Sequence, residues 1–146
     1  MSWRFHTVFA LAATLVVVST VAWGFVLVGS PATRRLERLD EQRLDDLRTI
    51  AREIQAMVED PNNKGTLKEA LPKTLEEAAR RARDERINLS DPESNEAYAY
   101  RATSETTYEL CATFTGQRDS DDSVFWNHPA GKHCFKIDVL DPPPFY

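Results

Sequence analysis

The pattern of apolar and polar positions divides the chain into an uncharged N-terminal run, a helical stretch and a strand-rich C-terminal half. Residues 7–29 form a run of 23 residues without a charged side chain. As a helix, this run is about 35 Å long, enough to cross the ~30 Å hydrocarbon core of a bilayer. Trp3 and Trp23 lie near its ends, where aromatic rings favour the membrane interface. We predict an uncleaved membrane-spanning helix over residues 7–29, preceded by a short flank of residues 1–6.

Over residues 33–59, apolar side chains recur every third or fourth position, the period of one helix face. These positions are Leu36, Leu39, Leu47, Ile50, Ile54, Met57 and Val58. Charged side chains, Arg48 among them, occupy the opposite side. We expect a long amphipathic helix whose charged side faces water. A contact of that side with lipid headgroups or a partner helix is the alternative.

The remainder predicts a short helix and three strands. Thr74 and Glu77 have the spacing of a capping box, which opens a helix that runs to about Arg86. Period-two alternation then predicts strands over 97–101, 107–115 and 134–139. Residues 30–140 are therefore expected to form one α+β domain, in which the long helix packs on a small antiparallel three-stranded sheet. A Pro-rich tail, residues 141–146, follows.

The expected helix–sheet interface joins two apolar faces. The helix contributes Leu47, Ile50, Ile54 and Met57. The sheet contributes Tyr98, Tyr100, Tyr108, Leu110, Phe114 and Ile137. Trp126, in the loop between the second and third strands, is expected to anchor that loop on the sheet edge. An alternative role for Trp126 is a platform for a ligand.

Charge and cysteine content narrow the function and the compartment. The chain carries a net charge of −5, and residues 87–146 hold 10 acidic and 4 basic side chains. This balance argues against nucleic-acid binding, which begins with neutralisation of phosphates. Cys111 and Cys134 are expected to form a disulfide, with free thiols or metal ligation as alternatives; such a pair suits an oxidising compartment. Arg34, Arg35 and Arg38 would by themselves favour a cytoplasmic domain. We nevertheless favour a cytoplasmic N-terminus and an external domain.

Candidate chemistry is sparse. Asp119, Asp121 and Asp122 share one loop and are weak candidates for a cation site. His128 and His133 could join the cysteines around zinc, but their spacing lacks the close ligand pairs of such sites. No nucleophile, phosphate-loop or metalloprotease motif occurs in the sequence. We expect no enzymatic activity, no resident metal and no cofactor.

Several segments in order give the chain a family resemblance. They are Val28-Gly29-Ser30-Pro31, residues 39–50, Asp91-Pro92 with Tyr98-Ala99-Tyr100, residues 110–114, and Trp126-Asn127-His128 leading to His133-Cys134-Phe135. In these the chain resembles uncharacterised bacterial single-pass membrane proteins with an outer domain like type IV pilins and type II secretion pseudopilins. The resemblance implies a pilin-like fold and a periplasmic domain anchored in the inner membrane. It also implies that a cation can occupy the acidic loop.

The function expected from these features is that of an interaction protein. It would be an accessory subunit of a larger membrane or envelope assembly, held in the bilayer through residues 7–29. The alternatives are a pseudopilus-like filament subunit and a small metal- or ligand-binding sensor domain. Pilins resemble one another in a glutamate five residues into the mature helix, and here residues 7–29 contain no acidic residue. This departure argues against leader processing and filament assembly.

Overall fold

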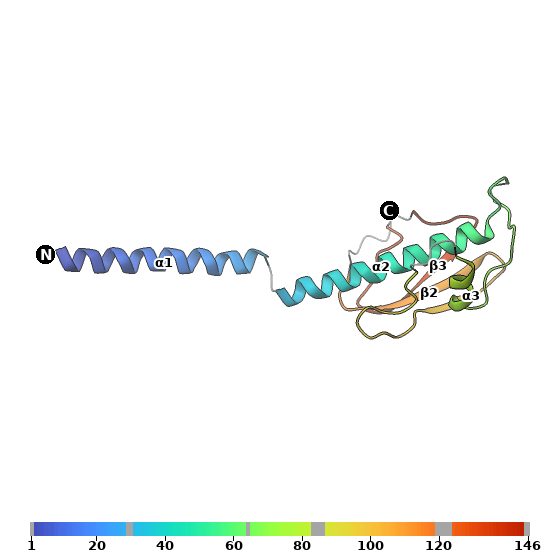
Figure 1. The fold of residues 1–146 in the computed structure, drawn as a ribbon. Helices are drawn as coiled ribbons and strands as arrows, with labels where there is room; N and C mark the ends of the chain where they lie inside the picture. Colours follow the sequence, from blue (N-terminus) through green and yellow to red (C-terminus); the bar gives the residue numbers. More distant parts are fainter. Residues whose placement is uncertain (1, 29–30, 64, 83–86, 119–123, 145–146) are drawn as a thin grey trace. The chain divides into compact units, whose positions relative to one another are not determined.

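The computed structural model describes residues 2–28, 31–63, 65–82, 87–118 and 124–144. Its elements, in chain order, are α1 (Ser2–Val28), α2 (Pro31–Val58), α3 (Leu75–Arg81), β1 (Ala99–Ala102), β2 (Thr107–Phe114) and β3 (Gly131–Asp138), as Figure 1 shows. They divide into two compact units, Met1–Arg35 and Leu36–Tyr146. The predicted α+β class, with an N-terminal apolar helix and a three-stranded antiparallel sheet, is confirmed.

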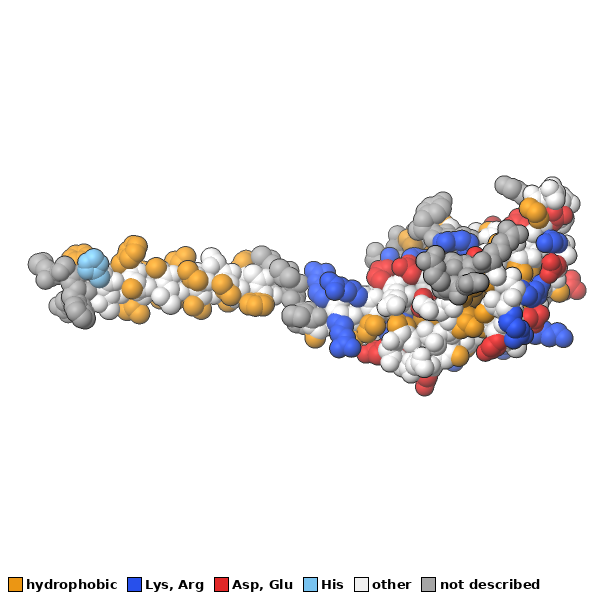
Figure 2. Space-filling model, viewed as in Figure 1, with side chains coloured by type: hydrophobic (Ala, Val, Ile, Leu, Met, Phe, Trp, Pro, Cys, Tyr) orange, Lys and Arg blue, Asp and Glu red, His pale blue; other side chains and the backbone are white. Residues whose placement is uncertain are grey.

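The apolar part of α1 is long enough to span a membrane by length and composition. It covers Phe5–Phe25, 21 residues, or about 32 Å of helix. Within Phe5–Phe25 the large apolar side chains are all more than half exposed, and Figure 2 shows hydrophobic side chains along this part of α1. The hydroxyls of Thr14 and Thr20 donate to the carbonyls of Ala10 and Val16, so these polar groups are satisfied within the helix. The helix also includes residues 2–6 of the predicted flank, which contain neither Gly nor Pro.

The sheet has the strand order β1-β2-β3, with both pairs antiparallel. In β2, even-numbered residues from Tyr108 to Phe114 are buried on one face, and their β3 partners include Phe135 and Ile137. The β3 residues Lys132, Cys134 and Lys136 lie on the opposite face and are exposed. This alternation follows from the two-residue period of a strand.

The domain core lies between α2 and the inner face of the sheet. Leu44, Leu47, Ile50, Ile54 and Val58 are at most 1% exposed and join the inner-face residues in one apolar cluster. Met57 is partly buried against the same cluster. Figure 1 shows α2 running along the sheet. The apolar side of α2 therefore forms the helix–sheet interface.

Element boundaries differ from the sequence expectations mainly at β1, α3 and β3; β1 is Ala99–Ala102, where a strand over 97–101 is expected. Regular helix in α3 ends at Arg81, because Ala82 is extended and closes the last turn on Ala78; residues 83–86 lie outside the described part. β3 begins at Gly131, three residues before the predicted Cys134. Lys132 and His133 pair with Thr113 and Ala112 of β2. Because both side chains are polar, the apolar alternation did not indicate that the strand begins before Cys134.

Candidate functional site: the cystine face and the buried charges

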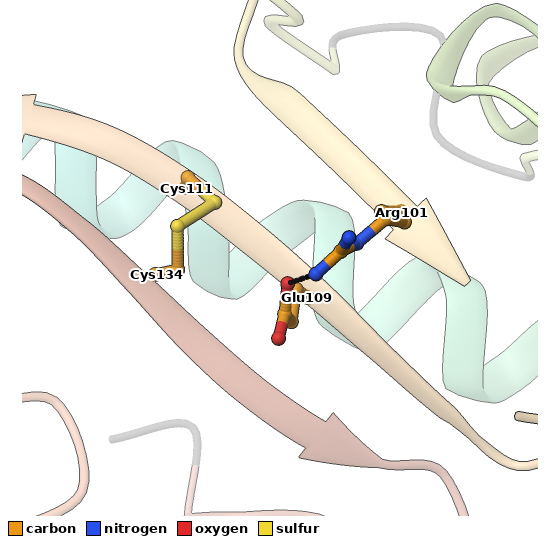
Figure 3. The surroundings of a disulfide bond; sticks show 4 residues. All are labelled: Arg101, Glu109, Cys111 and Cys134. Atoms are coloured by element: carbon orange, nitrogen blue, oxygen red, sulfur yellow. Dashed lines mark hydrogen bonds and ion pairs between the residues drawn. A yellow bond between two sulfur atoms is a disulfide. The ribbon is translucent and has the colours of Figure 1, made fainter. Parts of the chain in front are cut away.

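The two cysteines meet on the outer face of the sheet. Cys111 and Cys134 are register partners on β2 and β3, with their sulfurs 2.07 Å apart and their Cα atoms 4.0 Å apart. Beside them, Arg101 of β1 donates to Glu109 of β2 at 2.7 Å (Figure 3). The disulfide between Cys111 and Cys134 closes a long loop of the chain. In the chain-entropy account, this closure raises the free energy of unfolding by roughly 3 kcal/mol. Because both sulfurs are in the bond, neither cysteine is available as a metal ligand.

A cluster of buried charges gathers around Arg43 of α2. Its guanidinium donates to Asp91 from Nε at 2.5 Å and from Nη2 at 3.1 Å. It also donates to Asp40, one turn earlier, at 2.7 Å, and to Glu93 at 3.1 Å. Arg43, Asp40 and Asp91 are each less than 9% exposed. This arginine thus joins the start of the buried α2 stripe to the turn before β1.

Backbone amides complete the solvation of the two buried carboxylates. Asp40 accepts from the N–H groups of Thr115 and Gly116, which follow β2. Asp91 accepts from the N–H groups of Glu93 and Ser94. The hydrogen bonds from Arg43 hold the pKa of Asp91 far below its ordinary value, and those to Asp91 raise the pKa of Arg43. Fully paired charges of this kind fix one arrangement of helix, turn and strand end.

The sequence analysis did not identify this cluster. One feature of the sequence could have indicated the cluster. Asp40 and Arg43 stand at three- and four-residue spacing from the buried apolar positions Leu44, Leu47 and Ile50, so they lie on the same side of the helix. Charged residues in an apolar stripe indicate that a counter-charge from another element must reach them. The assignment of Arg48 to the water-facing side was wrong. Its side chain is 14% exposed, and its guanidinium carbon lies 5.5 Å from the ring centre of Trp126.

A small pocket adjoins the buried charges. It has a volume of about 140 Å³ and is lined by Glu37, Asp40, Glu41, Leu44, Gly116, Gln117, Arg118 and His128. The His128 ring is 3% exposed and stacks on Phe114, with ring centres 3.6 Å apart. Its Nδ1 lies 3.2 Å from the Pro129 carbonyl, and its Nε2 is buried without a hydrogen-bond partner in the described part of the chain. Burial lowers the pKa of His128, which favours the neutral imidazole.

Of the weak metal candidates, only His128 and His133 lie among the described residues. Asp119, Asp121 and Asp122 lie outside the described residues. His133 is on the inner side of β3, its ring 4.7 Å from that of Phe135, whereas the cysteines are on the outer side. Within the described ranges, no group of three His, Cys, Asp or Glu side chains is placed to hold a metal ion.

Trp126 lies in the core rather than in a ligand platform. It is 2% exposed, its ring centre is 5.0 Å from that of Phe135, and its indole N–H donates to the Pro144 carbonyl at 2.6 Å. These contacts fasten both the loop before β3 and the tail after it to the sheet.

Comparison with protein-family models, curated proteins and solved structures finds no match for this chain. Functional inference therefore depends on its own residues. The buried charges of the domain are held by one another and by backbone amides, an arrangement that makes a rigid support. On the outer sheet face, the side chains of Lys132, Cys134 and Lys136 are exposed.

Proposed function

We propose that this chain is a non-enzymatic, single-pass protein of a bacterial inner membrane whose outer domain serves as an interaction subunit of a larger envelope assembly. The supporting observation is the division into an apolar helix of membrane-spanning length and a separate compact unit carrying a cystine. Stable disulfides form in oxidising compartments, which favours a periplasmic domain and a cytoplasmic N-terminus.

A pilin-like architecture is part of the proposal. It is supported by the order of an apolar helix, an amphipathic helix packed on an antiparallel sheet, and a short C-terminal tail. Two of the segments that carry the resemblance, residues 39–50 and Asp91-Pro92, also meet in space. Asp40 and Arg43, from residues 39–50, bond to Asp91 and to the end of β2. Fold alone does not decide function, so filament assembly stays an alternative.

The absence of enzymatic activity in this proposal is supported by the hydrogen bonds of the buried polar groups. Arg43 and Asp91 are engaged with each other, and Asp40 is engaged with Arg43 and two backbone amides. A catalytic acid or base must instead reach a substrate proton. The buried charges are therefore best explained as structural ion pairs that hold the domain in one conformation for binding.

The test has a topology arm and an assembly arm. In intact cells, a membrane-impermeant maleimide is expected to label the cysteines only after treatment with a reductant. Mild-detergent extracts are expected to hold the chain in a complex larger than its monomer. Labelling without reductant, or a chain that is monomeric after gentle crosslinking and extraction, would contradict the proposal. Loss of an N-terminal leader, seen by mass spectrometry, would favour the pseudopilus-like filament subunit.

The pocket beside His128 favours a second candidate, a small metal- or ligand-binding sensor domain. A buried imidazole nitrogen without a partner among the described residues can accept a hydrogen bond from a small polar ligand. This function predicts that added ligand or divalent cation shifts the His128 ring resonances in NMR spectra. Unchanged resonances, together with an absence of metal in elemental analysis, would remove it.

A further inference from the structure

Between Lys132 and Lys136, no described residue pairs with the edge of β3 that faces away from β2. Thr103 donates its N–H to the Thr107 carbonyl at 2.8 Å, so the odd-numbered residues of β2 bond to β1 and the even-numbered ones to β3. The β3 partners of the even-numbered β2 residues are odd-numbered, so the odd-numbered residues of β3 bond to β2. The backbone groups of the even-numbered residues Lys132, Cys134 and Lys136 therefore point away from β2. The short Cα separation at Cys111 and Cys134, 4.0 Å, is typical of a pair without mutual backbone bonds. No other described residue bonds to these outward groups.

The open edge is basic, although this half of the chain is acidic. Residues 87–146 contain 4 basic side chains against 10 acidic ones, and two of the basic ones, Lys132 and Lys136, lie on β3. Both are exposed on the cystine face. Across the sheet, Arg101, Glu109 and Lys136 form a row of alternating charge, and Figure 3 shows its first two members paired. A fourth strand would continue the alternation with an acidic residue opposite Lys136.

A second copy of the chain fits this edge poorly. Antiparallel pairing of two β3 strands about Cys134 would place Lys132 of each copy opposite Lys136 of the other. Directly opposed like charges destabilise a strand pair, and edge lysines are a common means of preventing self-association. In this register the lysines oppose self-pairing, while the outward backbone groups stay available.

We infer that the outer edge of β3 binds an extended acidic segment of a partner protein, which adds a fourth strand to the sheet. The partner's backbone would bond to the outward groups of Lys132, Cys134 and Lys136. Its acidic side chains would lie four residues apart, opposite Lys132 and Lys136, as the two-residue period of a strand requires. This inference deepens the proposed interaction function and rests on it.

The test uses the full chain in detergent micelles, labelled with ¹⁵N. The probe is the peptide acetyl-Glu-Val-Thr-Val-Glu-amide, and its charge-reversed counterpart is acetyl-Lys-Val-Thr-Val-Lys-amide. We expect the acidic peptide to shift the amide resonances of Lys132, Cys134 and Lys136 and to slow their hydrogen exchange. The basic peptide is expected to bind about tenfold more weakly or worse, because two attractive cross-strand pairs become repulsive.

Charge reversal on the protein provides the matched control. The variant Lys132→Glu/Lys136→Glu should prefer the basic peptide, whereas Lys68→Glu/Lys73→Glu, which changes two exposed lysines away from β3, should retain the original preference. Lys136→Pro removes one outward N–H without touching the bonds to β2 and should weaken binding of the acidic peptide.

Three results would overturn the inference: slow exchange of the three amides in the free protein, equal binding of the two peptides, or pairing of β3 with a second copy. The proposed function has a separate readout, the size of the complex extracted from cells. A complex that survives Lys132→Glu/Lys136→Glu would leave the interaction function standing and remove β3 as its site.

Discussion

The two long helices of this protein are almost equal in length and differ in how their apolar side chains are arranged. α1 has 27 residues and α2 has 28. Between Phe5 and Phe25, α1 carries apolar side chains all round, and its large ones are exposed. α2 buries one stripe against the sheet and turns charged residues such as Glu41 and Arg52 outward. A helix that is apolar on all sides suits lipid as its solvent, whereas one with a single stripe needs a protein partner.

The comparison teaches that sequence constrains the two helices differently. In α1, each apolar side chain serves the same purpose, so another apolar residue can replace it. In α2, each stripe position meets a particular neighbour, and this holds even for charges: Arg43 is buried because Asp91 is there to receive it. Substitutions matched between the helices should therefore have unequal effects on the domain. For all of them, unfolding of the full chain in micelles can be followed by Trp126 fluorescence in a Trp3→Phe/Trp23→Phe background.

The largest effect is expected for Arg43→Ala in α2. The substitution leaves Asp40 and Asp91 buried without their shared cation and should lower the free energy of unfolding by about 3–5 kcal/mol. Arg52→Ala, on the exposed side of the same helix, should change it by less than about 0.5 kcal/mol. Urea titrations measure both. Equal losses in the two variants would mean that the buried cluster does not hold the domain together.

Leu47→Ala against Leu15→Ala tests the comparison directly. Leu47 is fully buried, so its truncation should cost the domain about 2–5 kcal/mol through lost contacts and a cavity. Leu15 is 67% exposed in α1, and its truncation should leave domain unfolding unchanged. The same urea titration serves for the pair. A comparable loss from Leu15→Ala would contradict the separation of roles between the helices.

Removal of the cystine tests how far the domain depends on its own small core. The double variant Cys111→Ser/Cys134→Ser should lose roughly 3 kcal/mol, because the unfolded chain regains the freedom of the closed loop. Reduction of the unsubstituted protein should give the same loss in a thermal scan, and reduction of the double variant should have no effect. A reduced protein of unchanged stability would show that packing alone holds β2 and β3.

Sequence patterns predicted those parts of the fold that depend on local periodicity. The amphipathic helix, expected over 33–59, is Pro31–Val58, and the middle strand, expected over 107–115, is Thr107–Phe114. Both have a strong period and clear turn residues at their ends. The cysteine pair could be expected because two strand-like runs each carried one cysteine, so that adjacent pairing could bring them together.

What the sequence did not reveal depends on contacts between distant residues. Arg43 and Asp91 are 48 residues apart, and nothing in the local pattern of either indicates the other. Arg48 belongs by period to the polar side, yet the loop that carries Trp126 folds over it. The early start of β3 is specified by pairing with β2, since Lys132 and His133 have weak strand preference of their own. Tertiary partners decided each of these cases.

Acid titration tests the contribution of the buried pair formed by Arg43 of α2 and Asp91. Hydrogen bonds from Arg43 depress the pKa of Asp91 in the folded state, so its contribution is complete above its unfolded pKa of about 4 and declines as pH falls below that value. Asp91→Asn should cost about 2 kcal/mol near neutral pH. In urea titrations, the difference in the free energy of unfolding between Asp91→Asn and the unsubstituted protein should shrink from about pH 4 downward. A difference that is constant with pH would assign the effect to turn geometry.

The smallest expected effect concerns α3, which has no long apolar stripe to stabilise it. α3 has only 7 residues, and its ends carry complementary charges: Glu76 and Glu77 in the first turn, Arg80 and Arg81 in the last. The Thr74 hydroxyl accepts from the Glu77 N–H, and the Glu77 carboxylate accepts from the Lys73 N–H. Thr74→Ala removes the first of these bonds and should cost about 1 kcal/mol, whereas Thr74→Ser should cost little. Hydrogen exchange at the Glu77 amide measures the local loss.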